Sequence, residues 1–239
     1  MRVLIVSPVC NRAWIATDLV QNLRELDTEG IEADFLFLEN GSTDDSLQIL
    51  LKACADWPAA RVASYKDQDH LPNYQRKQPK GHPGYLRMAH IRDYFRRLTV
   101  EGGYDYLLSV DSDIMVQPRT LKALLEHKLD FVAAMISNSG TEDFKGVNAA
   151  GFRPGQGDPP YRQWPAWFKW EPTGEGVREV GGTGACFLAS RAILADTTYL
   201  YSVSTQSRYY IPPGRAGDVF GEDFEYAKCC GDLGWKQYL

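Results

Sequence analysis

Two carboxylates stand one residue apart at the end of an apolar run. Residues 106–110 read Tyr-Leu-Leu-Ser-Val, and Asp111 and Asp113 follow them. The run predicts a buried strand of an α/β sheet, and ligands of such sheets bind outside the carboxyl ends of strands. Hard oxygen ligands there suit Mg²⁺ or Mn²⁺, which in turn hold phosphate oxygens. A strand-to-helix turn capped by Ser112 or Asp113 explains the same residues without a ligand.

The elements that must position this pair alternate along the first half of the chain. Apolar runs of strand type and helix-spaced apolar residues follow each other, which predicts a parallel sheet with helices on both faces. We expect strands at residues 2–7, 33–38, 61–65, 106–110 and 131–136, with helices at 14–26, 47–51, 85–98 and from Pro118. After residue 137 the alternation weakens, and we expect a glycine-rich turn and strand within 180–189, a short helix from Ser190, a helix over 221–233 and a strand from 235.

Composition narrows the class of protein. The 239 residues can form one large α/β domain or two small ones, and the net charge of −5 argues against general nucleic-acid binding. Five cysteines without Cys-x-x-Cys spacing predict free thiols in a reducing cytoplasm. No apolar run approaches the roughly 20 residues of a membrane span, so a cytoplasmic protein is predicted, with peripheral membrane contact left open.

Aromatic residues gather in the irregular stretch over residues 137–178. Trp164, Trp167, Phe168 and Trp170 lie within seven residues. A small packed cluster under a long loop and a lip that binds a sugar acceptor explain this pattern equally well.

Four short motifs follow one another in a known order. They read VSPVCNR at residues 6–12, ENGSTD at 39–44, HIRD at 90–93 with VDSD at 110–113, and GED at 221–223. This series resembles the motifs P-x-x-N-R, D-D-G-S-T-D, A-R-N with Asp-x-Asp, and E-D of GT-A fold glycosyltransferases, closest to the family-2 type. The resemblance spans nearly the whole chain.

The resemblance implies one GT-A domain over residues 1–239, an α/β/α sandwich of three layers with a mainly parallel central sheet. Residues 1–136 would bind the donor, a UDP-sugar or GDP-sugar, and residues 137–239 would bind the acceptor and supply the base. The activity implied is that of a hexosyltransferase-like enzyme.

The family's donor site is implied at eight positions of this chain. The nucleobase pocket would be shaped by Pro8, Asn11 and Arg12, and the acidic residue that meets the nucleobase would be Glu39. Arg92 would lie near the diphosphate or the nucleobase. Ribose and metal would be contacted by Asp111, Ser112 and Asp113, with Asp111 and Asp113 as the metal ligands. Bound Mn²⁺ or Mg²⁺ would neutralise the leaving nucleoside diphosphate.

The acidic pair near the end of the chain would supply the base. By itself, an acidic pair at a helix start simply complements the helix dipole. The resemblance makes Asp223 the general base that deprotonates the acceptor hydroxyl, with Glu222 as the alternative. Inversion by single displacement is then expected, retention is the lesser alternative, and the acceptor is a glycan, a lipid-linked group or a protein.

This chain departs from the family pattern at two places that bear on the donor. Glu39 and Asn40 replace the usual acidic pair, which leaves the identity of the nucleobase open. Many relatives also place a metal-binding histidine beyond the position that corresponds to Leu239, and the four histidines of this chain lie upstream. We therefore expect weakened metal binding unless another group replaces that ligand.

Three other classes of function compete with a glycosyltransferase. A sugar-phosphate nucleotidyltransferase would carry a glycine-rich loop after the first strand, which residues 8–12 lack. A dehydrogenase is disfavoured because no Gly-x-Gly-x-x-Gly follows Ser7. A catalytically silent nucleotide-sugar-binding module remains the main alternative to an enzyme.

Overall fold

The computed structural model describes residues 1–65, 82–138, 146–147, 149–150, 176–177, 179–180, 182–197, 226–227, 229–231 and 233–239. The helices are α1 (Ala16–Arg24), α2 (Ser46–Ala53), α3 (His82–Glu101), α4 (Thr120–Glu126) and α5 (Arg191–Asp196). The longer strands are β1 (Arg2–Val9), β2 (Glu32–Glu39), β3 (Ala60–Ser64), β4 (Tyr106–Val110), β5 (Phe131–Ala133) and β11 (Cys186–Ser190). Short strands are β6 (Ser137–Asn138), β7 (Gly146–Val147), β8 (Ala149–Ala150), β9 (Glu179–Val180), β10 (Gly182–Thr183) and β12 (Gln237–Tyr238).

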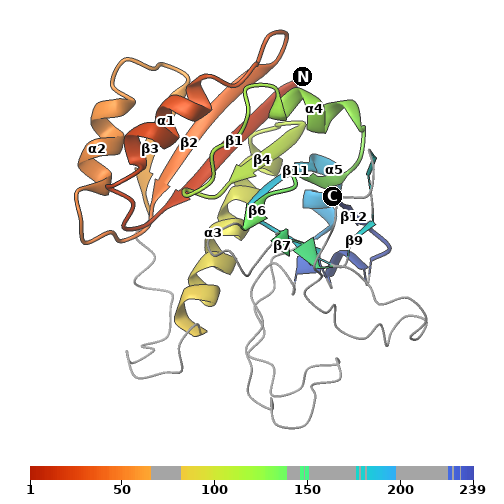
Figure 1. Ribbon diagram of the computed structural model, residues 1–239. Helices are drawn as coiled ribbons and strands as arrows, with labels where there is room; N and C mark the ends of the chain where they lie inside the picture. The colour runs from red at the N-terminus through yellow and green to blue at the C-terminus, as the bar shows by residue number, and fades with distance from the viewer. Residues whose placement is uncertain are drawn as a thin grey trace.

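A mainly parallel sheet organises the molecule, as the alternation predicted (Figure 1). Within the described residues its strand order is β3-β2-β1-β4-β11-β5-β12-β9. β1 pairs in parallel with β2 and β4, β2 with β3, and β12 with β5. β11 runs antiparallel between β4 and β5, and β9 is antiparallel to β12. The first four strands therefore point their carboxyl ends toward one edge.

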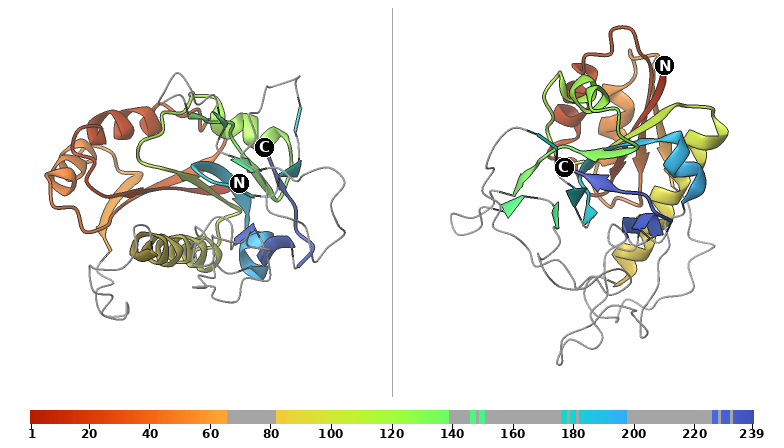
Figure 2. Two further views of the ribbon diagram at one scale, coloured as in Figure 1. Left: turned by 60° about the horizontal axis from the view of Figure 1, so that its bottom comes forward. Right: turned by 90° about the vertical axis from the view of Figure 1, so that its right-hand side faces the viewer.

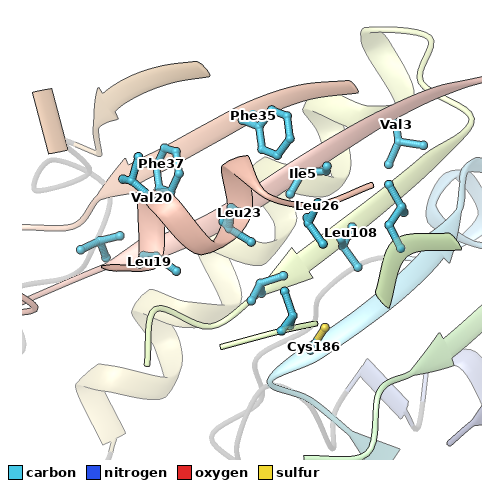
Figure 3. Close-up of a cluster of buried hydrophobic side chains, with 14 of the residues drawn as sticks. Val3, Ile5, Leu19, Val20, Leu23, Leu26, Phe35, Phe37, Leu108 and Cys186 are labelled. Atoms are coloured by element: carbon cyan, nitrogen blue, oxygen red, sulfur yellow. The ribbon is translucent and has the colours of Figure 1, made fainter. Parts of the chain in front are cut away.

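Helices cover both faces of this sheet, which gives three layers (Figure 2). Helices α1, α2 and α4 pack with one apolar cluster, and α3 and α5 pack with the other. Neighbouring residues of β1 alternate between the two clusters, since Val3 and Ile5 belong to one and Leu4 and Val6 to the other. Figure 3 shows the first cluster, where side chains of α1 pack against those of the sheet.

Most predicted boundaries shift by one to three residues, and hydrogen bonds explain two of these shifts. The strand expected over 131–136 ends at Ala133, because its partner β11 begins only at Cys186, whose carbonyl accepts the last ladder bond from Ala134 N–H (2.9 Å). The helix expected from Pro118 begins at Thr120, after a turn in which Thr120 N–H donates to the Gln117 carbonyl (2.9 Å).

Among the described residues, no helix combines the length and the apolar character needed to cross a bilayer. All five cysteines are free thiols, as their spacing predicted.

Candidate functional site

The turn after β4 holds both carboxylates of the Asp-x-Asp pair at the predicted edge of the sheet. Asp111 N–H donates to the carbonyl of Ala185 at 2.7 Å, and the Asp111 carbonyl accepts from Ile114 N–H at 3.1 Å. Ala185 has a φ of 66°, in the left-handed region that a residue with Cβ seldom adopts. Ser112 is buried beneath the turn, whereas the side chain of Asp113 is 46% exposed. The backbone is thus fixed and the outer carboxylate faces solvent.

Arg92 lies beneath Asp111 and supports it from α3. Its Nη1 donates to Ser109 Oγ at 3.0 Å, its Nη2 donates to Asp111 Oδ1 at 3.2 Å, and its guanidinium carbon lies 5.3 Å from the ring centre of Phe187. Arg92 itself is only 2% exposed. Burial raises the pKa of Asp111, and the charge of Arg92 opposes that rise. The arginine expected near the diphosphate or the base is therefore a buried counter-ion of the first carboxylate.

Arg12 reaches the second carboxylate from the turn after β1. Its Nη2 donates to Asp113 Oδ2 at 2.9 Å. Its backbone N–H donates to Ser46 Oγ at 2.8 Å, and its carbonyl accepts the N–H groups of Ile15 and Ala16 at the start of α1. The guanidinium was expected in the nucleobase pocket, and the structure places it against the Asp-x-Asp pair.

The turns after β1 and β2 are tied together by side chains. Asn11, at a φ of 53°, accepts Thr43 N–H on its Oδ1 (2.8 Å) and donates its own N–H to Ser42 Oγ (3.0 Å). Asp44 accepts Ala13 N–H (3.0 Å). These bonds give the side chains of Ser42 and Asp44 a direct role in joining the two turns.

Asp44 also accepts from the hydroxyl of Ser46, and this bond is the largest cause that lowers the pKa of Asp44. Ser46 is fully buried and joins Asp44 to the backbone of Arg12. The predicted site residues did not include four residues that the structure places here: Ser42, Thr43, Ser46 and Ala185. The Gly-Ser-Thr-Asp motif pointed to Ser42 and Thr43, and the glycine-rich turn expected within residues 180–189 included Ala185 without giving it a role.

The turn that follows β2 contains two buried polar side chains, those of Glu39 and Asn40. Glu39 accepts Ser42 N–H on its carboxylate, so it holds the turn in place. Asn40 is 5% exposed, and its buried Oδ1 has no hydrogen-bond partner among the described residues. A buried acceptor without a donor costs about 1–3 kcal/mol. Above them, a Cβ on Gly41 would lie 3.0 Å from Arg87 Nη2, so the guanidinium of Arg87 covers this turn.

Pro8 lies buried in β1, opposite Leu38 of β2. The pairing of β1 with β4 ends at Val6, so the missing N–H of Pro8 breaks no ladder on that side.

The donor set suits a hard divalent cation. Asp111 and Asp113 bring carboxylate oxygens to one turn, and each engages one arginine through one of its oxygens. Within the described ranges, no group of three or more His, Cys, Asp and Glu side chains could hold a metal ion. Two carboxylates fit an ion such as Mg²⁺, which keeps waters and binds phosphate oxygens alongside one or two protein carboxylates.

Comparison with known proteins rests on structure alone, because no family model and no curated protein matches this sequence. TarS 1–349 of S. aureus in complex with UDP-GlcNAc superposes with a TM-score of 0.53 at 18% identity, covering 96% of this chain and 53% of that one. The same protein with UDP gives 0.51 at 18% identity, covering 95% and 54%. The chain has the GT-A fold. It spans about half the length of TarS 1–349, and a likeness at this identity shows the fold alone.

In this GT-A chain the fold gathers most of the predicted site residues at the carboxyl ends of β1, β2 and β4. They are Pro8, Asn11, Arg12, Glu39, Arg92, Asp111, Ser112 and Asp113. The predicted base Asp223, its alternative Glu222 and the aromatic group at residues 164–170 lie outside the described residues.

Proposed function

We propose that this chain is a glycosyltransferase that binds a nucleotide-diphospho-sugar and transfers its sugar to an acceptor hydroxyl. One observation carries the proposal: in a GT-A fold, the Asp111-Ser112-Asp113 turn stands at the carboxyl end of the central strand β4 with an arginine on each carboxylate. The similar structures support the donor class, since TarS forms complexes with UDP-GlcNAc and with UDP.

Asp111 and Asp113 would hold Mn²⁺ or Mg²⁺ together with oxygens of the diphosphate. The ion supplies Lewis-acid neutralisation of the nucleoside diphosphate that leaves. Arg92 favours the charged form of the Asp111 carboxylate and orients it through the hydrogen bond from Nη2. The outer carboxylate, which is the more exposed, faces the incoming ligand.

The nucleobase would lie over the β2 turn. Among the described residues the Oδ1 of Asn40 has no donor, and this acceptor suits a ring N–H, which both uracil and guanine carry. Glu39 would then contribute to nucleobase binding only indirectly, because its carboxylate accepts Ser42 N–H and so fixes the turn.

We assign the role of general base to Asp223, with Glu222 as the alternative and inversion as the expected outcome. The resemblance of residues 221–223 to the E-D motif supports this assignment, and the described helical residues resume at Tyr226. Tyr226, three positions after Asp223, is 1% exposed, and its hydroxyl lies 2.9 Å from Thr197 Oγ1 at the end of α5. Its ring also packs against Phe131 of β5, with the ring centres 6.0 Å apart.

A thermal-shift screen of UDP-sugars and GDP-sugars, each with and without Mn²⁺, tests the proposal. A ligand at 100 times its Kd adds about 2.7 kcal/mol to the free energy of unfolding, so a bound donor raises Tm measurably. We expect a shift that needs both nucleotide and Mn²⁺. No shift with any nucleotide-sugar would refute the proposed function.

Two variants separate binding from chemistry. Asp113→Asn should lose metal-dependent donor binding, whereas Asp223→Asn should keep donor binding and lose transfer. Donor binding without transfer to any of a range of acceptors would favour the non-catalytic module. Release of pyrophosphate from a nucleoside triphosphate and a sugar phosphate would favour the nucleotidyltransferase.

A further inference from the structure

The guanidinium of Arg12 uses few of its hydrogen-bond donors. Its one short bond is the 2.9 Å contact with Asp113, and Nη1 lies 3.4 Å from the carbonyl oxygens of both Cys10 and Asn11. Its Nε is buried and has no partner among the described residues. A guanidinium carries five N–H donors in a rigid fork that matches carboxylate or phosphate oxygens. Arg12 therefore retains donors for a further anion.

Arg12 combines a fixed backbone with a releasable side chain. The backbone is held by Ser46 Oγ and by the first turn of α1. The two side chains of the Arg12–Asp113 pair are 33% and 46% exposed, and ion pairs at such exposure stabilise by only about 0.2–1 kcal/mol. The side chain can thus change partner without unfolding the turn.

The other arginine of the site behaves differently. The side chain of Arg92 is 3% exposed and is also held by Ser109 and the ring of Phe187. Asp111 consequently has a permanent cationic partner, and Asp113 has an exchangeable one.

We propose that Arg12 is a tethered cation that neutralises Asp113 in the ligand-free protein and passes to the donor diphosphate when a divalent cation takes its place. The inference rests on the proposed donor binding. A divalent ion held by Asp113 would compete with the positive charge of Arg12, which already contacts Oδ2 of this carboxylate. The displaced guanidinium then finds phosphate oxygens, the acceptors that its fork matches best, next to the same ion.

The proposal predicts effects of opposite sign in one variant. Arg12→Met removes the competitor of the metal, so Mn²⁺ alone should bind more tightly by up to about fivefold, measured from free Mn²⁺ by electron paramagnetic resonance. The same variant lacks the diphosphate contact, so UDP at saturating Mn²⁺ should bind about tenfold more weakly by calorimetry. Arg12→Lys keeps the charge but lacks the fork, so its Mn²⁺ affinity should stay near that of the wild type.

Arg119→Met is the matched control. It removes one positive charge from an exposed ion pair with Glu126, and both affinities should stay unchanged. A purely structural role of Arg12 would weaken both affinities together, and that result overturns the proposal. Mn²⁺ binding to Arg12→Met that is absent, unchanged or weaker also overturns it, and unchanged UDP affinity overturns the transfer to the diphosphate. Failure of the wild type to bind UDP with Mn²⁺ would instead refute the proposed function, while the titration with Mn²⁺ alone still decides whether Arg12 competes for Asp113.

Discussion

Replacement of Arg92 by Met tests whether the inner carboxylate depends on its buried cation. Met preserves much of the packing volume but leaves Asp111 without its counter-ion and Ser109 Oγ without its donor. Removing one member of a buried ion pair costs about 3–5 kcal/mol. Because the Asp111 side chain is 32% exposed, water solvates the unpaired carboxylate and offsets part of this cost. We therefore expect the free energy of unfolding to fall by roughly 2–3 kcal/mol. For a chain of this size that lowers Tm by about 5–10 °C.

The loss should depend on pH, and the sign follows from the pKa of Asp111. Burial raises that pKa and Arg92 opposes the rise, so Arg92→Met raises it further. A carboxyl whose pKa is higher in the folded state destabilises the fold progressively as pH rises above its unfolded value and through its folded value. The deficit of Arg92→Met should therefore be larger at pH 8 than at pH 5, because protonation of Asp111 at lower pH compensates for more of the missing positive charge.

Thermal melts of the wild type and Arg92→Met at both pH values provide the assay. The control is Arg97→Met on the same helix, where an arginine that is 51% exposed pairs with Asp93 and contributes less than about 1 kcal/mol. Mn²⁺ should recover more of the Tm in Arg92→Met than in the control. Equal deficits of Arg92→Met at pH 5 and pH 8, or a deficit no larger than that of Arg97→Met, would refute the argument.

The other expectations concern the outer carboxylate, the turn and the thiols. Asp113→Asn should change the free energy of unfolding by less than about 1 kcal/mol, because its ion pair is exposed, yet remove the Mn²⁺-dependent gain in UDP affinity measured by calorimetry. Ser46→Ala should lose about 1–3 kcal/mol in urea melts, because the Arg12 N–H would lack its acceptor, and no loss would contradict the role of this bond. Burial raises the pKa of Cys186 and of Cys230 to about 12, so at pH 8 only about one thiol in 10⁴ is ionised. Iodoacetamide followed by mass spectrometry should modify the half-buried Cys10 long before either of them, and equal rates would show that the two buried thiols are accessible.

Much of the fold follows from local sequence patterns. Continuous apolar runs predicted β1, β2 and β4, and helix-spaced apolar residues predicted the helices between them, because each element must bury one face or both. The Asp-x-Asp pair could be placed at a strand end for the same reason. The antiparallel position of β11 between β4 and β5 was not predicted. The neighbours of a strand that comes late in the chain depend on how the earlier strands are arranged in space, and local sequence does not specify that arrangement.

The chain alone therefore determined which residue types stand at the carboxyl ends of the strands, because strand length and turn chemistry are local. Tertiary structure decided their partners. Arg12 and Asp113 are 101 residues apart, and Arg92 meets Asp111 only because α3 packs beneath β4. Side-chain pairs of this kind depend on how distant backbones approach in space, and no local periodicity encodes that approach. The same packing left the Oδ1 of Asn40 buried without a donor, a property that only the folded chain has.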